Sequence, residues 1–268
     1  MILKTPAIVL RQHPYTETSR VVTWLTPDRG RINTLIKGAM RPKSGFLGQF
    51  DLFYTCELLY YARTSDGLPI TRECSPIATR PALRTNWRAC ALASYLCALV
   101  CRATPAQATR RTLYDWLESA LDDAAAQGGS ATVLFWYELD LLHRLGLAPR
   151  LAGCRTCGAP PPPSGEAAFA YAEGGWYCPR CRETLATARE QIWVPAGSVR
   201  LMLAWQQSET PDAARGAAAT FSIQEGIERA LGLFLAHHVD VPPGPRAAAL
   251  DILSRHPFRP VDRTGALG

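Results

Sequence analysis

Two Cys-x-x-Cys pairs are the part of this chain best suited to chemistry. Cys154 and Cys157 form the first pair, and Cys178 and Cys181 form the second. Each pair can direct two sulfur atoms at one centre, and four such thiolates are typical ligands of a tetrahedral Zn²⁺. Unrelated buried thiols, two disulfides or a redox-active pair are the alternatives. The doubled motif, with Gly158 after the first pair, favours one structural zinc ion, because four thiolates leave no position for a substrate.

Motifs for catalysis are missing from the sequence, which therefore predicts no catalytic residue and no enzyme. A nucleobase deaminase would need His-x-Glu, but none of the five histidines is followed two residues later by Glu. The patterns His-Glu-x-x-His and Gly-x-x-x-x-Gly-Lys-Ser/Thr are also absent. The adjacent His237 and His238 suit the end of a helix better than a metal site. An enzyme whose groups assemble only in space is the alternative.

A second constellation consists of the basic residues Lys37, Arg41 and Lys43, which follow a predicted strand and alternate with Gly and Pro. Exposed cations on such a loop suit phosphate contacts, and glycines permit close approach of the backbone. With Arg29 and Arg31 on the preceding turn, they favour a basic rim on the N-terminal part of the chain.

Charge is distributed unevenly along the 268 residues. The chain has a net charge of +6, and residues 1–80 carry eleven Lys/Arg against six Asp/Glu. The excess of positive charge near the N-terminus indicates a polyanionic partner, and a solvated basic face is the alternative. The odd count of nine cysteines favours a reducing cytoplasm. No apolar stretch is long enough to predict a membrane span or a signal peptide.

The elements that must position these residues change type near Pro81. Before it, short β-branched and aromatic runs predict five strands and a small OB-type barrel; these runs are residues 6–10, 21–26, 31–36, 50–61 and 68–74. Five nearby aromatic residues suit either base stacking or the barrel core, and the core is favoured; they are Trp24, Phe46, Phe50, Phe53 and Tyr54.

After Pro81 the apolar spacing is helical. It predicts helices near 87–101, 104–126, 130–145 and 195–207, and one behind a capping box that starts at Ser222. Cys90, Cys97 and Cys101 lie on one face of the first helix and are interpreted as small core residues. The fold class is therefore α+β and multidomain: an N-terminal OB-fold β-barrel and a C-terminal α-helical domain with an inserted Cys₄ zinc module.

The order of these parts resembles the RecO family of bacterial DNA-repair and recombination-mediator proteins. The residues that carry the resemblance are Ala7–Leu10 with Tyr15–Ser19, Gly30-Arg31 leading into Lys37–Ala39 and Arg41–Ser44, and Glu138–Pro149 running into the first cysteine pair. It covers about residues 1–250. The resemblance implies domains at 1–80 (OB-fold, DNA-binding), 81–150 with 186–250 (helical) and 151–185 (zinc), with a flexible tail at 251–268.

The resemblance further implies a non-enzymatic protein that binds single- and double-stranded DNA and anneals complementary strands. With RecR, it would help to load RecA on DNA coated by single-strand DNA-binding protein, in the cytoplasm and at the nucleoid. The implied DNA contacts are Lys37, Arg41 and Lys43, then Arg29, Arg31 and Arg11. The zinc ligands carry over to the four cysteines. A zinc-stabilised RNA-binding module and a protein–protein adaptor are the alternatives. The C-terminal half departs from the family, because Gly244-Pro245-Arg246 replaces a Lys/Arg-rich segment.

Overall fold

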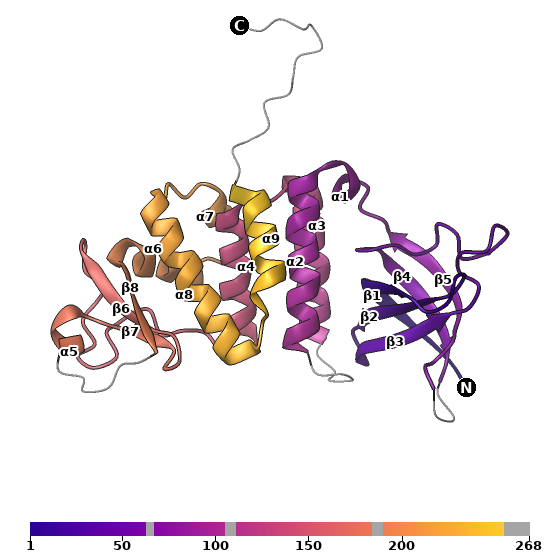
Figure 1. Ribbon diagram of the computed structural model, residues 1–268, viewed down its shortest axis with the longest axis horizontal. Helices are drawn as coiled ribbons and strands as arrows, with labels where there is room; N and C mark the ends of the chain where they lie inside the picture. Colours follow the sequence, from indigo (N-terminus) through magenta and orange to yellow (C-terminus); the bar gives the residue numbers. More distant parts are fainter. Residues whose placement is uncertain (63–66, 105–110, 184–189, 255–268) are drawn as a thin grey trace, which may run out of the picture.

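Three parts follow one another along the longest axis of the molecule: a barrel, a group of helices and a small sheet (Figure 1). The computed structural model describes residues 1–62, 67–104, 111–183 and 190–254. Residues 105–110 of the predicted helix near 104–126 and most of the predicted tail at 251–268 lie outside these residues.

The barrel is built from five antiparallel strands in the order β3-β2-β1-β4-β5. Their bounds are β1 (Ile2–Pro14), β2 (Arg20–Thr26), β3 (Gly30–Ile36), β4 (Thr55–Tyr61) and β5 (Thr71–Ala78). The two edges meet where Leu35 pairs with Ile70 in parallel and donates its N–H to the Pro69 carbonyl at 2.8 Å. The predicted OB-type barrel is therefore confirmed.

The predicted strand over 50–61 is wrong in its first part. Residues 51–54 form a turn, in which the Tyr54 N–H donates to the Asp51 carbonyl at 3.1 Å. Phe53 has a φ of 70°, a left-handed conformation. Its N–H still donates to the Val9 carbonyl at 3.1 Å, but the regular pairing of β4 with β1 begins only at Thr55. The sequence predicted a strand at this turn because aromatic residues have a high strand propensity.

Strand β1 is buried on both faces, which explains its continuous apolar run. Ala7 and Val9 pack inside the barrel with Trp24, whereas Ile8 and Leu10 pack against the helices. The other four aromatic residues that the sequence singled out also join one core or the other, as favoured above: Tyr54, Phe46 and Phe50 in the barrel and Phe53 on the helical side.

Helices fill the middle of the molecule and follow the predicted order. Their bounds are α1 (Ala82–Thr85), α2 (Trp87–Ala103), α3 (Arg111–Gln127), α4 (Ala131–Arg144), α6 (Ala196–Gln206), α7 (Asp212–Arg215), α8 (Phe221–Val239) and α9 (Pro243–Ser254). Ser130 caps α4, but α8 is capped by Thr220 and not by Ser222, because the Thr220 side chain accepts the Ile223 N–H. Helix α9 continues past the predicted boundary at 250. Across the described helices, we find none with the length and apolarity that crossing a membrane requires.

The three cysteines of α2 are core residues, as predicted. Cys97 and Cys101 are buried and Cys90 is half-buried. Burial raises the pKa of the Cys97 and Cys101 thiols, so both are neutral at physiological pH.

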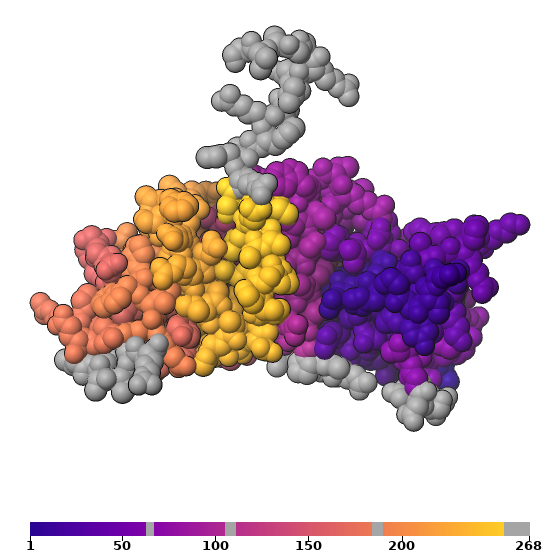
Figure 2. All heavy atoms as spheres, viewed as in Figure 1, coloured from indigo at the N-terminus to yellow at the C-terminus, as the bar shows by residue number. Residues whose placement is uncertain are grey.

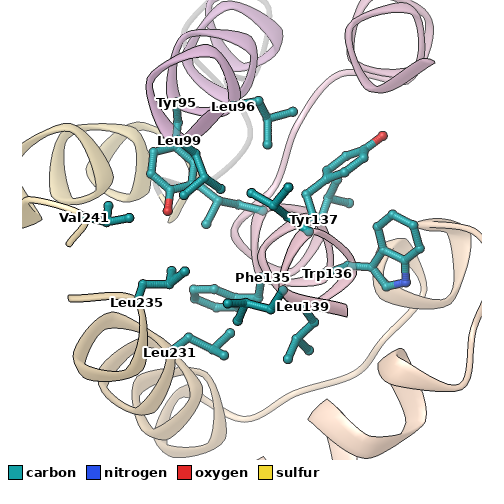
Figure 3. Close-up of a cluster of buried hydrophobic side chains, with 14 of the residues drawn as sticks. Tyr95, Leu96, Leu99, Phe135, Trp136, Tyr137, Leu139, Leu231, Leu235 and Val241 are labelled. Atoms are coloured by element: carbon teal, nitrogen blue, oxygen red, sulfur yellow. The ribbon is translucent and has the colours of Figure 1, made fainter. Parts of the chain in front are cut away.

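A buried ion pair connects the central helices. Glu138 on α4 is fully buried, and its carboxylate accepts two hydrogen bonds from Arg246 on α9, at 2.7 and 3.0 Å. The Tyr95 hydroxyl of α2 donates to the same carboxylate at 2.5 Å, and Arg246 also donates to the Glu228 carbonyl of α8 at 2.9 Å. Burial alone would lower the pKa of Arg246, but the Glu138 charge raises it above its ordinary value. Figure 3 shows Tyr95 among the apolar side chains of this core.

A second buried arginine joins the barrel to the helices. Arg80 follows β5 with a φ of 47°, and its guanidinium donates to the Phe53 carbonyl at 2.7 Å and to Asp122 of α3 at 2.6 Å. It also donates to the Thr55 hydroxyl at the start of β4, at 3.0 Å. The barrel and α3 therefore share one cation at their junction.

We predict that Arg246→Met destabilises the protein by about 3–5 kcal/mol, because Glu138 is left charged and buried without its cation. Chemical denaturation measures the free energy of unfolding. The control is Arg144→Met, which breaks the half-exposed ion pair with Asp140 and is expected to cost less than about 1 kcal/mol. Equal losses in both variants would contradict the structural role of the buried pair.

Candidate metal centre and nucleic-acid interface

The four predicted zinc ligands converge on one point. The ligand atoms of Cys154, Cys157, Cys178 and Cys181 all lie within 4.8 Å of one another, and two of the sulfur atoms are 3.9 Å apart. A tetrahedral Zn²⁺ with Zn–S bonds of about 2.3 Å requires sulfur atoms about 3.8 Å apart. One pair of sulfur atoms already has this separation, so the donor set fits zinc, and all four cysteines lie together as the sequence predicted.

Backbone geometry shapes the first cysteine pair. The Cys154 N–H donates to the Ala159 carbonyl at 2.8 Å, and Gly158 has a φ of 72°, which favours glycine. A Cβ on Gly153 would lie 2.7 Å from the Gly158 carbonyl oxygen, so this position has room for glycine only. Two glycines thus fold the chain into a tight knuckle around Cys154.

A small antiparallel sheet presents the second pair. Its order is β7-β6-β8, with β6 (Glu166–Ala170), β7 (Gly175–Tyr177) and β8 (Gln191–Pro195). Cys178 directly follows β7, and Cys181 lies on the short helix α5 (Pro179–Glu183). The Arg155 N–H donates to the Trp176 carbonyl at 3.0 Å, which fixes the first knuckle against β7.

The pKa values of two of the four thiols depart from their ordinary value, in opposite directions. Burial raises the pKa of Cys154, but hydrogen bonds from the backbone N–H groups of Cys157, Cys178 and Thr156 lower it more, to about 6. The side chain of Cys178 raises the pKa of Cys181 to about 12, since it hydrogen-bonds the neutral thiol. A divalent cation removes this imbalance, because coordinated thiols are deprotonated. Zn²⁺ would supply only structural cross-linking here.

The predicted basic loop lies on the connection between β3 and β4, which extends from the barrel away from the helices (Figure 1). Lys37, Arg41 and Lys43 are exposed, and none has an ion-pair partner among the residues that the structure describes. The start of the connection is fixed, because the Gly38 N–H donates to the Ser19 hydroxyl at 3.2 Å. The Met40 N–H donates to the Thr18 carbonyl at 2.9 Å.

The remaining predicted cations lie elsewhere on the barrel. Arg29 is near Asp28, at 3.7 Å, on the β2–β3 turn. Arg11 and Arg31 face Cys101 on α2, and their charges oppose the rise in the pKa of that thiol which burial causes. Arg31 and Lys37 are six residues apart along β3, which corresponds to roughly 20 Å. The six cations therefore form two groups and not one continuous rim.

Two further arginines join these groups, and the sequence interpretation missed both. Arg20 pairs with Ile36 across the β2–β3 hairpin, next to Lys37. The hairpin register, read from the turn at Pro27, would have placed it there. Arg102 lies with Arg11 on the wall of a hollow of about 410 Å³ between the barrel and the helices. It comes from α2, so only the tertiary fold brings it close.

Comparisons with known proteins match both halves of the chain. A family model described as the N-terminal domain of recombination protein O matches residues 1–80, and one for its C-terminal domain matches residues 84–247. Similar relatives carry the name DNA repair protein RecO. One from Syntrophus aciditrophicus is 29% identical, over 87% of this chain and 90% of its own length. One from Anaeromyxobacter is 30% identical, over 88% and 91%. One from Exiguobacterium is 32% identical, over 67% and 70%.

We predict that the purified protein contains zinc at one atom per chain, measured by elemental analysis. Cys178→Ser is expected to lose the metal and to lower the melting temperature, because the small sheet loses its cross-link. Cys90→Ser changes a half-buried cysteine outside the site and is expected to retain the zinc. A metal-free protein that melts like the zinc-loaded one would refute the structural role.

Proposed function

Because this chain belongs to the RecO family of DNA repair and recombination proteins, we propose that it is a DNA-binding recombination mediator with no catalytic activity of its own. One observation carries the DNA-binding part of this proposal. Lys37, Arg41 and Lys43 are exposed on a projecting loop of an OB-fold barrel, and no carboxylate in the described part of the chain pairs with them. Unpaired cations release counterions from the phosphate backbone, and that release is the main source of affinity without sequence preference.

The two separated groups of cations support a role in strand annealing. Two complementary strands repel each other along their backbones, and a protein that neutralises both lowers that repulsion. We assign the first strand to Lys37, Arg41 and Lys43. We assign the second to Arg11 and Arg31, with Arg29 on the adjacent β2–β3 turn, at the end of β3 that is remote from Lys37. Either group can accept single- or double-stranded DNA, because both kinds of DNA present phosphates, which carry no sequence information.

The proposal extends to partners through the family alone. RecR would act with this protein to load RecA on DNA that single-strand DNA-binding protein covers, and DNA as a partner implies a place in the cytoplasm at the nucleoid. The zinc ion would be the one cofactor and would stabilise residues 151–185. We propose domains at 1–80, at 81–150 with 196–254, and at 151–195. The end of the second domain is moved to include all of α9, and the end of the third is moved to include β8, which pairs with β6.

We predict that Lys37→Ala/Arg41→Ala/Lys43→Ala weakens binding of a single-stranded oligonucleotide and flattens its salt dependence. Loss of three phosphate contacts is expected to reduce the slope of log K against log salt by about 2. Fluorescence anisotropy with labelled oligonucleotide over a range of salt concentrations measures both quantities. Competition with RNA of the same sequence distinguishes a DNA-binding protein from an RNA-binding module.

The control removes the same net charge from cations that already have carboxylate partners. Lys4→Gln/Arg72→Gln/Arg84→Gln breaks ion pairs with Glu57, Glu73 and Asp51. We expect a much smaller change in affinity and slope, since paired cations attract fewer phosphates. If the two triple variants behave alike, net charge and not the loop governs binding, and the assignment fails.

A further inference from the structure

An acidic hollow lies on the helical part, apart from the basic barrel. It has a volume of about 520 Å³ and adjoins a second hollow of about 230 Å³, with which it shares Asp140, Arg144 and Glu209. Its walls come from α3, α4 and the connection between α6 and α7. Five carboxylates line it in a chain whose net charge is +6: those of Asp115, Asp123, Asp140, Glu209 and Asp212.

The inner carboxylates have structural partners, whereas the rim is available. Asp123 accepts from the Tyr137 hydroxyl at 2.7 Å and pairs with Arg215 at 2.5 Å. Asp140 accepts from the Trp116 indole at 2.7 Å and pairs with Arg144 at 3.0 Å, and Arg215 also pairs with Asp212 at 3.2 Å. Five carboxylates against these two arginines still leave the hollow with a net negative charge. Glu209 is exposed, and it has no hydrogen-bond or ion-pair partner among the described residues. Asp115 is also exposed. Its ion pair with Arg111 is long, at 3.7 Å, and water screens it strongly.

A buried donor without an acceptor provides an independent sign of a ligand. Trp136 lines the hollow, is 4% exposed, and its indole nitrogen has no hydrogen-bond partner within the described part of the chain. Figure 3 shows its side chain pointing away from the apolar cluster around Phe135. The indole nitrogen of Trp205, in the adjoining hollow, is likewise buried without a hydrogen-bond partner among the described residues. Buried N–H groups are almost always paired, so both positions suit an acceptor oxygen from elsewhere.

We propose that this hollow binds an arginine-bearing segment of a partner protein. Guanidinium groups pair with carboxylates in bidentate geometry and stack on aromatic rings, and backbone carbonyls of the segment would accept from the indole N–H groups. A metal ion fits poorly, since the cysteine quartet is the one group of potential ligands close enough to hold one among the described residues. DNA is excluded by its charge. This inference goes beyond DNA binding and does not depend on it.

The test uses the full-length, zinc-loaded protein and an octapeptide of alternating glycine and arginine with blocked ends. Asp115→Asn/Glu209→Gln removes two rim charges without touching the paired inner carboxylates. It is expected to weaken peptide binding about tenfold in fluorescence titrations. Trp136→Phe keeps an aromatic ring, although a smaller one, removes the N–H donor and is expected to weaken binding as well. The matched control, Glu190→Gln/Glu225→Gln, removes two exposed charges outside the hollow and is expected to bind like the parent.

Three results would overturn the proposal. The first is equal affinity of the rim variant and the matched control, which would indicate binding by net charge. The second is binding of a glycine–lysine peptide as tightly as the arginine peptide, because a point charge lacks the bidentate contacts. The third is peptide binding that occurs only after residues 255–268 are deleted, because the occupant would then be the chain itself. Oligonucleotide binding of the rim variant should equal that of the parent, which keeps this test separate from the DNA-binding proposal.

Discussion

The buried pair of Glu138 and Arg246 is the interaction on which the arrangement of the molecule depends. Through Tyr95 and the Glu228 carbonyl it joins α2, α4, α8 and α9 at one carboxylate and one guanidinium. Helix α2 contacts the barrel on one side, and α8 contacts β8 of the small sheet on the other. A charge pair in an apolar core tolerates little displacement, because each ion loses its hydration and keeps only its partner. The helical part is therefore a fixed spacer between a barrel that carries exposed cations and a sheet that holds the cysteine quartet.

Exposed cations and exposed carboxylates lie on different parts of the protein surface. The β3–β4 connection presents cations without partners, whereas the hollow beside α3 and α4 presents carboxylates and indole N–H groups. Helix α9, whose exposed face Figure 2 shows, lies between the barrel and the small sheet. Its one arginine, Arg246, is buried in the core. The C-terminal half has no surplus positive charge, which is consistent with our proposal that DNA binds at the barrel. The cysteine quartet would fit this division as a purely structural element, since a metal ion bound by four thiolates has no position for a substrate.

Much of this could be predicted from the sequence where local patterns decide. The spacing of the cysteines was sufficient to predict that all four lie together, and short β-branched and aromatic runs predicted the strands of the barrel. The turn at 51–54 was missed because its aromatic residues pack in two cores, which strand propensity cannot distinguish. The separation of Arg31 from Lys37 follows from strand direction and was not considered. Arg246 was noted only as part of a segment poor in basic residues, because only the tertiary fold supplies its partner Glu138. The acidic hollow likewise combines residues about a hundred positions apart, such as Asp115 and Asp212, and no local pattern reveals it.

The central claim is that DNA occupies the β3–β4 connection of the barrel. Hydrogen–deuterium exchange of the full-length protein, with and without a single-stranded oligonucleotide, tests it most directly. We predict slower exchange of backbone amides over residues 37–47 when DNA is bound, and unchanged exchange over residues 207–216 beside the acidic hollow. Protection confined to the helical part, with no change over residues 37–47, would contradict the claim.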